Sequence, residues 1–258
     1  MKKNNIEVGA CSHKGHYKKE NQDRLIVKIG EDAIGEFGLF AVADGVSSFI
    51  KSSKASQYII EQIDLFWTKE MSKSIYKSNN TIKIIEKIIT TIKNSHNYII
   101  NTLQNERLGT TLSLLFVRQG SYGIIHIGDS RIYVYKNRKL IQLTKDHTYV
   151  QGLIDKNKIS QKNAKKNSRR HILTQCIGGS PIITLDSKIG QISNEDIYLI
   201  CSDGLYDEIK EKEIVKILDK VAKKKITSQE GVQVLLKSVL NKKAKDNITI
   251  IIVKGGYF

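Results

Sequence analysis

The stretch TLSLLFVRQGSYGIIHIGDSRIYVY, residues 111–135, contains three apolar runs separated by short polar turns. The runs Thr111–Val117, Tyr122–Ile127 and Arg131–Tyr135 are rich in β-branched and aromatic residues, which favour strands. Turns as short as these join antiparallel neighbours, because a parallel connection needs a dozen or more residues. The stretch therefore predicts three consecutive strands of an antiparallel sheet.

Further strands and three helices are predicted on either side of this stretch. Apolar runs predict strands at Arg24–Ile29, Gly38–Ala43, Ile183–Ile189, Ile197–Cys201 and Ile248–Val253. Helices are expected at residues 52–69, along an apolar stripe in the next segment, and at Ser228–Leu240. The stripe comprises Ile82, Ile85, Ile89, Ile92, His96, Ile99 and Leu103. Two adjacent helices, without strict alternation of strand and helix, favour an α+β fold with helix pairs on an antiparallel core. No repeat or flexible linker divides the chain, so one domain, 1–258, is expected.

The composition is that of a globular chain with a strong positive charge. Lys and Arg total 42 against 26 Asp and Glu, which gives a formal charge of +16, and 40% of the residues are hydrophobic. Only seven of the basic residues are Arg, which supplies most bidentate base contacts, so nucleic-acid binding is not predicted. No membrane span or secretion signal is expected. Three distant Cys residues argue against a disulfide framework and favour the cytoplasm.

Several common catalytic signatures are missing. The sequence has no G-x-x-x-x-G-K-[ST] phosphate loop, no G-x-G-x-x-G turn, no H-E-x-x-H helix and no G-x-S-x-G nucleophile turn. None of Cys11, Cys176 and Cys201 is followed by Arg six positions later, as in thiol-dependent phosphatases. The six His residues show no metal-ligand spacing, and His96, on the apolar stripe, is expected to be a core residue.

Aspartates at the ends of apolar runs are the chemical feature that remains. The run LFAVADG (39–45) ends in Asp44 and Gly45, and YLICSDG (198–204) repeats the pattern. A buried carboxylate is costly unless it is paired or bound to a metal. Carboxylate and carbonyl oxygens suit Mg²⁺ or Mn²⁺ better than Zn²⁺. Any single Asp-Gly is equally an ordinary turn, but the set together predicts a metal centre. The set is Asp23, Asp44, Asp129, Asp203 and Asp246.

Eight short motifs occur in an order that resembles the metal-dependent protein serine/threonine phosphatases of the protein phosphatase 2C family, in their compact bacterial form. They are GHYKKENQD (15–23), VADG (42–45), LGTTLS (108–113), IGDSRIYVY (127–135), LTKDH (143–147), ILTQCIGG (172–179), CSDGLYD (201–207) and DNIT (246–249). No motif is decisive alone, but eight in this order are specific. The resemblance implies a four-layer α-β-β-α sandwich, with two facing antiparallel sheets and a helix pair on each outer face.

The resemblance also implies a centre of two Mn²⁺ or Mg²⁺ ions between the sheets. Carried over by motif, Asp44 would bridge both ions and the Gly45 carbonyl would bind one. Asp203 and Asp246 would hold the other ion. A water or hydroxide that bridges the two metals would attack the phosphorus of phosphoserine or phosphothreonine.

Three further features follow from the same resemblance. Asp23 would hold metal-bound water from outside the ligand shell, and Asp129 with Asp203 would help form a third, weaker metal site. Residues 148–171 fall where bacterial relatives carry a mobile flap beside the active site. This segment has seven basic and no acidic residues between positions 156 and 170. It is either a solvated charged loop or a guide for phosphopeptides.

Three positions depart from the family pattern. The phosphate-binding Arg of the family is replaced by Lys18, which cannot make a bidentate contact. The alternative interpretation is that Lys18 is a solvated surface lysine without a role in the site. Gln22 replaces an acidic residue before Asp23, so water beside the second metal would be held less tightly. Val46 stands where eukaryotic relatives carry a His proposed as the general acid, so the leaving group must be protonated differently.

Two functions stay open at this point, and a third is weak. The first is a monomeric, active phosphatase for phosphoserine and phosphothreonine proteins, opposing a cognate Ser/Thr kinase. The alternative is a catalytically weak or inactive pseudophosphatase that binds phosphoproteins as a regulator. Retention of Asp44, Asp203 and Asp246 favours the first. A nucleic-acid binder rests only on the +16 charge and lacks a basic patch interleaved with aromatic residues.

Overall fold

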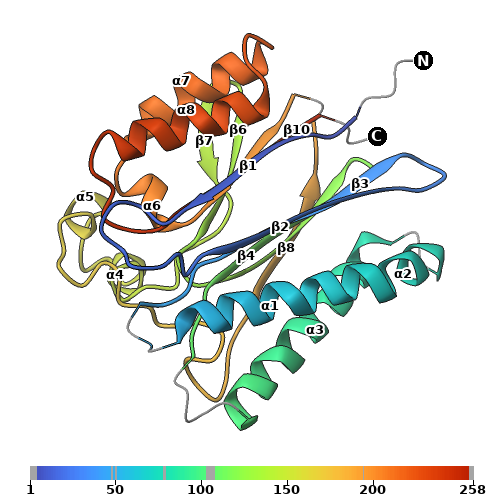
Figure 1. Cartoon of the computed structure of the whole chain (residues 1–258), viewed down its shortest axis with the longest axis horizontal. Helices are drawn as coiled ribbons and strands as arrows, with labels where there is room; N and C mark the ends of the chain where they lie inside the picture. Colours follow the sequence, from blue (N-terminus) through green and yellow to red (C-terminus); the bar gives the residue numbers. More distant parts are fainter. Residues whose placement is uncertain are drawn as a thin grey trace.

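Two antiparallel sheets of five strands each form the centre of the molecule (Figure 1). The computed structural model describes residues 5–47, 49, 51–77, 80–102, 108–193 and 195–255. In spatial order, the first sheet contains β1 (Glu7–His13), β10 (Ile248–Lys254), β9 (Ile197–Cys201), β6 (Arg131–Lys136) and β7 (Lys139–Gln142). The second contains β2 (Arg24–Glu31), β3 (Glu36–Ala43), β4 (Leu112–Arg118), β5 (Ser121–Ile127) and β8 (Asp186–Gln191).

A helix pair covers the outer face of each sheet, which confirms the four-layer α-β-β-α prediction (Figure 1). On the second sheet lie α1 (Ser52–Phe66) and α3 (Thr81–Thr102), and on the first lie α7 (Glu211–Ala222) and α8 (Ser228–Leu240). A π-helical turn, Trp67–Met71, joins α1 to α2 (Ser72–Lys77). Shorter helices are α4 (Tyr149–Asp155), α5 (Gln161–Ala164) and α6 (Asp203–Tyr206).

Three apolar layers hold these elements together. Successive strand residues point to opposite faces of a sheet, so a strand covered on both sides must be apolar throughout. In β3, the side chain of Leu39 packs toward α1 and α3, while that of Phe40 packs between the sheets. Both are fully buried. This double burial explains why the predicted strands appear as continuous apolar runs.

Several elements of the structure were not predicted, among them the strands β1 and β7, the helix α7 and the short helices, and one predicted strand is shifted. The edge strand β1 is half-buried and the edge strand β7 is mostly exposed, and neither carries a continuous apolar run. The helix α7 was missed although its buried residues follow a helical period. The predicted strand Ile183–Ile189 begins later, at Asp186, because Ile183 and Leu185 instead pack against the helical core.

The apolar stripe predicted on the second helix, α3, is correct at Ile85, Ile92, His96 and Ile99 and wrong at Ile82. The buried apolar residues of α3 are Ile84, Ile85, Ile88, Ile92 and Ile99, whereas Ile82 is 49% exposed and Ile89 is half-buried. Leu103 lies outside the described residues. The core assignment of His96 is confirmed, since it is 2% exposed and its Nδ1 accepts from the Gly178 amide at 3.1 Å. No helix in the described ranges is both long and apolar enough to cross a bilayer.

Candidate metal centre and substrate cleft

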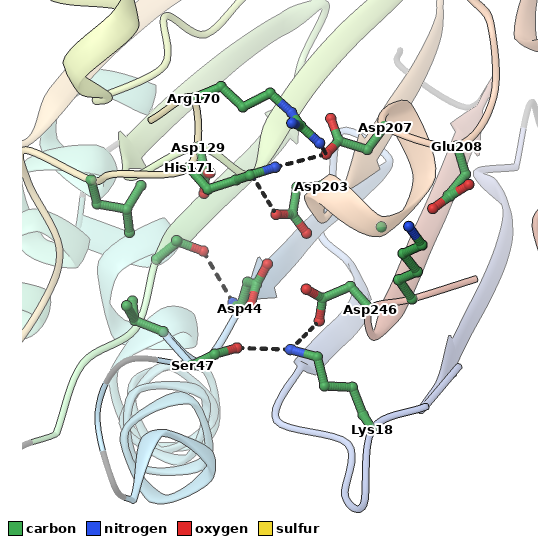
Figure 2. Close-up of a pocket in the computed structure, with 16 residues that line it drawn as sticks. Lys18, Asp44, Ser47, Asp129, Arg170, His171, Asp203, Asp207, Glu208 and Asp246 are labelled. Carbon is green, nitrogen blue, oxygen red and sulfur yellow. Dashed lines mark hydrogen bonds and ion pairs between the residues drawn. The ribbon is translucent and has the colours of Figure 1, made fainter. Parts of the chain in front are cut away.

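The five predicted aspartates gather at one end of the sandwich, where strands of both sheets start or stop. Asp44 follows β3 and Asp203 follows β9, while Asp23 and Asp246 precede β2 and β10. Asp129 lies in the turn between β5 and β6. Four of them line a cleft of about 470 Å³, and only Asp23 lies behind its wall. Figure 2 shows the carboxylates of Asp44, Asp203 and Asp246 turned toward a common space.

The segment Gly109–Thr111 fixes the backbone of Asp44. The Asp44 amide donates to Thr111 Oγ1 at 3.0 Å, and the Asp44 carbonyl accepts from the Thr111 amide at 2.8 Å. The hydroxyl of Thr110 also donates to this carbonyl, at 2.9 Å. With its own amide and carbonyl held, Asp44 has a defined side-chain direction. The motif that contains these threonines therefore positions Asp44.

The glycine after each of the two aspartates allows a close backbone approach. A Cβ on Gly45 would lie 2.8 Å from the carbonyl oxygen of Gln22, and one on Gly204 would lie 2.0 Å from that of Asn247. Both distances are too short for a side chain, so glycine is required at each position. In this way the Asp44 turn packs directly on the segment that carries Asp23, and the Asp203 turn packs on the segment that carries Asp246.

Asp23 supports the cleft from inside the protein. It is 1% exposed, and its Oδ2 accepts from Ser202 Oγ at 2.8 Å and from Thr249 Oγ1 at 2.7 Å. Its Oδ1 is buried without a hydrogen-bond partner in the described part of the chain. Burial raises the pKa of Asp23 to about 6, although the two hydroxyl donors lower it. Ser202 and Thr249 were not identified as site residues from the sequence, although both lie within motifs of the family pattern.

The carboxylates that line the cleft disfavour one another's ionised form. Burial, followed by the negative charges of Asp23 and Asp203, holds the pKa of Asp44 well above its usual range. Burial and the charge of Asp203 do the same for the pKa of Asp129, which is 5% exposed. The pKa of Asp203 is also raised, mainly by burial. A cluster of this kind becomes fully ionised at neutral pH only when a strong positive charge compensates it.

The available ligand atoms fit divalent hard cations. All the carboxylates that face the cleft offer oxygen, which Mg²⁺ and Mn²⁺ prefer, and no cysteine lines it. One carboxylate oxygen each of Asp129 and Asp203 lies with a ring nitrogen of His171 inside a 4.8 Å group. The buried Oδ1 of Asp23 is a further acceptor beside Asp44. The residues present are therefore suitable for a metal centre.

Cationic side chains enter the cleft from two sides (Figure 2). From one side, Lys18 Nζ lies 2.7 Å from Asp246 Oδ1 and donates to Ser47 Oγ at 2.8 Å. This contact places Lys18 inside the site rather than on a solvated surface. Val46 also lines the cleft. Gln22 Oε1 accepts from the cleft residue Ser47 at 3.4 Å, while the Gln22 amide nitrogen donates to Glu20.

From the other side, the end of the flap segment (residues 148–171) contacts α6. His171 Nδ1 lies 3.4 Å from Asp203 Oδ2, and its Nε2 lies 3.1 Å from Asp207 Oδ2. Hydrogen bonds to Asp203 and Asp207 raise the pKa of His171 to about 10. Arg170 reaches Asp207 at 3.3 Å. Sequence spacing did not identify His171 or Asp207 as site residues, because the fold brings them together from separate motifs.

The chain belongs to the protein phosphatase 2C family, whose sequence profile matches residues 12–241. It is 29% identical over 221 residues to the serine/threonine phosphatase stp of Listeria monocytogenes, covering 83% of this chain and 82% of the relative. The crystal structure of the serine/threonine phosphatase PstP/Ppp of Mycobacterium tuberculosis superposes with a TM-score of 0.80 at 25% identity, over 96% of this chain and 98% of that one. The PstP catalytic domain in complex with two manganese ions superposes with a TM-score of 0.78 at 25% identity, over 97% and 98%.

Proposed function

We propose that this protein hydrolyses phosphoserine and phosphothreonine in proteins, at a centre of two Mn²⁺ or Mg²⁺ ions held by Asp44, Gly45, Asp203 and Asp246. The convergence of three carboxylates from both sheets on one cleft carries this proposal. The ions, when bound, supply positive charge for the phosphate and lower the pKa of a water molecule. A third, weaker ion is assigned to Asp129 and Asp203, with His171 in reach of both.

The residues of the chain have separate tasks in this proposal. Lys18, held by Asp246 and Ser47, binds a phosphoryl oxygen as a point charge. Asp23, from its buried position behind Asp44, would hold a water molecule of the centre through its Oδ1. Such groups are already in position before the reaction begins, so their charges and hydrogen-bond donors need no reorganisation in the transition state.

An active enzyme is favoured over the alternative of a pseudophosphatase. A binding module needs a phosphate site but has no need for buried carboxylates that repel one another. In this cleft Asp44, Asp129 and Asp203 all have raised pKa values that a metal centre would relieve. The named relatives are serine/threonine phosphatases.

We also propose partners and a location that fit this activity. Phosphorylated proteins are the substrates, and a Ser/Thr kinase that makes them is the expected counterpart. All three cysteines are free, which is consistent with a reducing cytoplasm. We propose that the protein acts there as a monomer.

The decisive experiment is manganese-dependent release of phosphate from a phosphothreonine peptide. Asp44→Asn and Asp203→Asn should each lower kcat by at least about a hundredfold, because each removes a charge from the centre. The matched control is Asp64→Asn, which makes the same change at a partly exposed position of α1 paired with Lys28. Wild-type-like turnover of either centre variant at saturating Mn²⁺ would reject the assignment.

A further inference from the structure

His147, the residue before the flap segment, takes both polar backbone groups of Gly128. The His147 amide donates to the Gly128 carbonyl at 2.7 Å, and the Gly128 amide donates to His147 Nδ1 at 3.2 Å. Since Nδ1 accepts, the ring proton lies on Nε2, which donates to Asp186 Oδ2 at 3.2 Å. The ring of His147 therefore connects the β5–β6 turn to the start of β8.

The turn held in this way carries Asp129. Gly128 has a φ of +104°, and a Cβ there would meet Thr111 Cγ2 at 2.5 Å. The next carbonyl, that of Asp129, accepts from the hydroxyl of Tyr206 at 3.0 Å. The turn is thus fixed at Gly128 by His147 and at Asp129 by Tyr206. A change at His147 would release the residue next to a carboxylate of the cleft.

The same residue lies at the base of the flap segment. The His147 carbonyl accepts from the Thr174 amide at 2.8 Å, and the Tyr149 amide donates to the Ile172 carbonyl at 2.8 Å. Residues 147–149 and 172–174 therefore form a short paired stem below the flap. Arg170, which contacts Asp207, and His171, which contacts Asp203, directly precede the second half of this stem.

We propose that His147 is a positioning residue that fixes the Asp129 turn to the stem of the flap, so that the two are set together. Its backbone holds the stem and its ring holds the turn, while Asp186 sets the tautomer that the turn requires. The inference rests on the proposed function only where it places Asp129 in the metal centre. The connection between the turn and the flap is independent of catalysis.

Substitutions of His147 by Asn and by Gln test the two contacts of its ring separately. In His147→Asn, the side-chain oxygen can occupy the place of Nδ1 and accept from Gly128, but the side chain cannot reach Asp186. In His147→Gln, the amide can reach Asp186 but leaves the Gly128 amide without its acceptor. A role in packing alone would make the two variants alike, whereas the proposal predicts that Asn preserves function better than Gln.

The first measurement is limited trypsin cleavage, with cut sites identified by mass spectrometry. The flap offers seven basic residues between positions 156 and 170, and Lys224, in the turn after α7, is an internal reference cut. His147→Gln should be cut severalfold faster in the flap at an unchanged reference rate, and His147→Asn should match the wild type. Equal flap cleavage in all three proteins would overturn the proposal.

The second measurement is Mn²⁺ binding, followed by the paramagnetic resonance of free Mn²⁺. His147→Gln should weaken the weakest binding event by about tenfold, the usual cost of removing a residue that orients a metal ligand. His147→Asn should leave it within about threefold. Unchanged Mn²⁺ binding in the Gln variant would overturn the connection to Asp129, whatever the activity. An inactive wild type with the predicted flap cleavage would instead reject the proposed function alone.

A second variant covers the case in which His147→Gln does not fold. Asp186 is exposed and is the Nε2 partner, so Asp186→Ala frees the ring without altering the core. It should accelerate flap cleavage by about two- to threefold, because the ring can then adopt the other tautomer, in which Nδ1 no longer accepts from the Gly128 amide. A wild-type cleavage rate in this variant would overturn the role assigned to the imidazole.

Discussion

Lys18 is the residue that we propose binds the phosphate, at a position where the family pattern predicts an arginine. Its ammonium group lies between Asp246 and Ser47, at 2.7 and 2.8 Å, and can offer a phosphate one point contact. A guanidinium group would make two parallel contacts. We therefore expect Lys18→Arg to lower KM for a phosphothreonine peptide by roughly three- to tenfold, with little change in kcat.

The matched control for this prediction is Lys19→Arg, the same change at the exposed neighbouring lysine. Steady-state kinetics at saturating Mn²⁺ yield both constants. An unchanged KM in Lys18→Arg would mean that the ammonium group already binds phosphate as well as a guanidinium would, and that the bidentate contact brings no advantage in this cleft.

Among the individual residues, the sequence identified the carboxylates of the site but not the side chains that hold them in place. Asp44 and Asp203 follow apolar runs, and a charge at the end of a buried strand is unusual enough to notice. Ser202 and Thr249 carry no such signal, because serine and threonine occur throughout the sequence. Their task depends on Asp23, which is 179 and 226 residues away in the chain. Only the folded sheets bring these three side chains together.

Among the elements, the flap segment is the one whose charge predicts a measurable effect. Seven basic and no acidic residues lie between positions 156 and 170, and one of them, Arg170, lines the cleft. If they attract phosphopeptides, kcat/KM for a peptide should fall severalfold between roughly 0.05 M and roughly 0.3 M salt, because screening shortens the reach of surface charge. A small aryl phosphate, which does not extend to the flap, should respond much less.

The control for the flap is a matched removal of charge elsewhere. Replacing three exposed flap lysines with serine should reduce the salt response, whereas the same change at three exposed lysines of α7 and α8 should not. The flap lysines are Lys162, Lys165 and Lys166, and the control lysines are Lys216, Lys220 and Lys237. The same salt response for the peptide and the aryl phosphate would show that the flap charge is only a solvated surface.

The elements also show where sequence patterns were sufficient. Strands buried on both faces were identified because Leu39 and Phe40 must both be apolar. The helix α7 could have been identified, since Ile214, Ile217, Leu218 and Val221 follow a helical period. The edge strand β1 could not, because its half-buried residues need not be apolar. In α3, isoleucines on several faces left the buried side undetermined until the sheet was in place.

In the whole molecule, the two sheets meet at the cleft, and the carboxylates that each sheet brings there repel those of the other. Asp23 and Asp44 belong to the second sheet, and Asp203 and Asp246 to the first. In the metal-free protein the raised pKa values mean that ionisation of these groups opposes folding. We therefore expect Asp44→Asn, which removes one of the charges, to raise the Tm of the metal-free protein at pH 7.5 while reducing the increase in Tm that Mn²⁺ produces.

The pH dependence of this stabilisation has a defined sign. Asp23 has a folded pKa of about 6 against an ordinary value of 3.8, so its protonated form stabilises the metal-free fold fully below about pH 4. That contribution is lost as the pH rises through about 6. His126 acts in the opposite direction, since burial lowers its pKa to about 4, but it does not line the cleft and should contribute equally with and without metal.

Comparing the metal-bound protein with the metal-free protein therefore isolates the contribution of the cleft carboxylates to stability. Because protons and metal ions compete for the same oxygens, the increase in Tm caused by saturating Mn²⁺ should be small near pH 5 and grow steadily toward pH 7.5. Thermal unfolding followed by circular dichroism, with Mn²⁺ or with chelator, measures it at each pH. Asp44→Asn should flatten the dependence and Asp64→Asn should not. An Mn²⁺ effect of the same size at pH 5 and pH 7.5 would mean that the metal does not bind to these carboxylates, and that the two sheets are not joined through it.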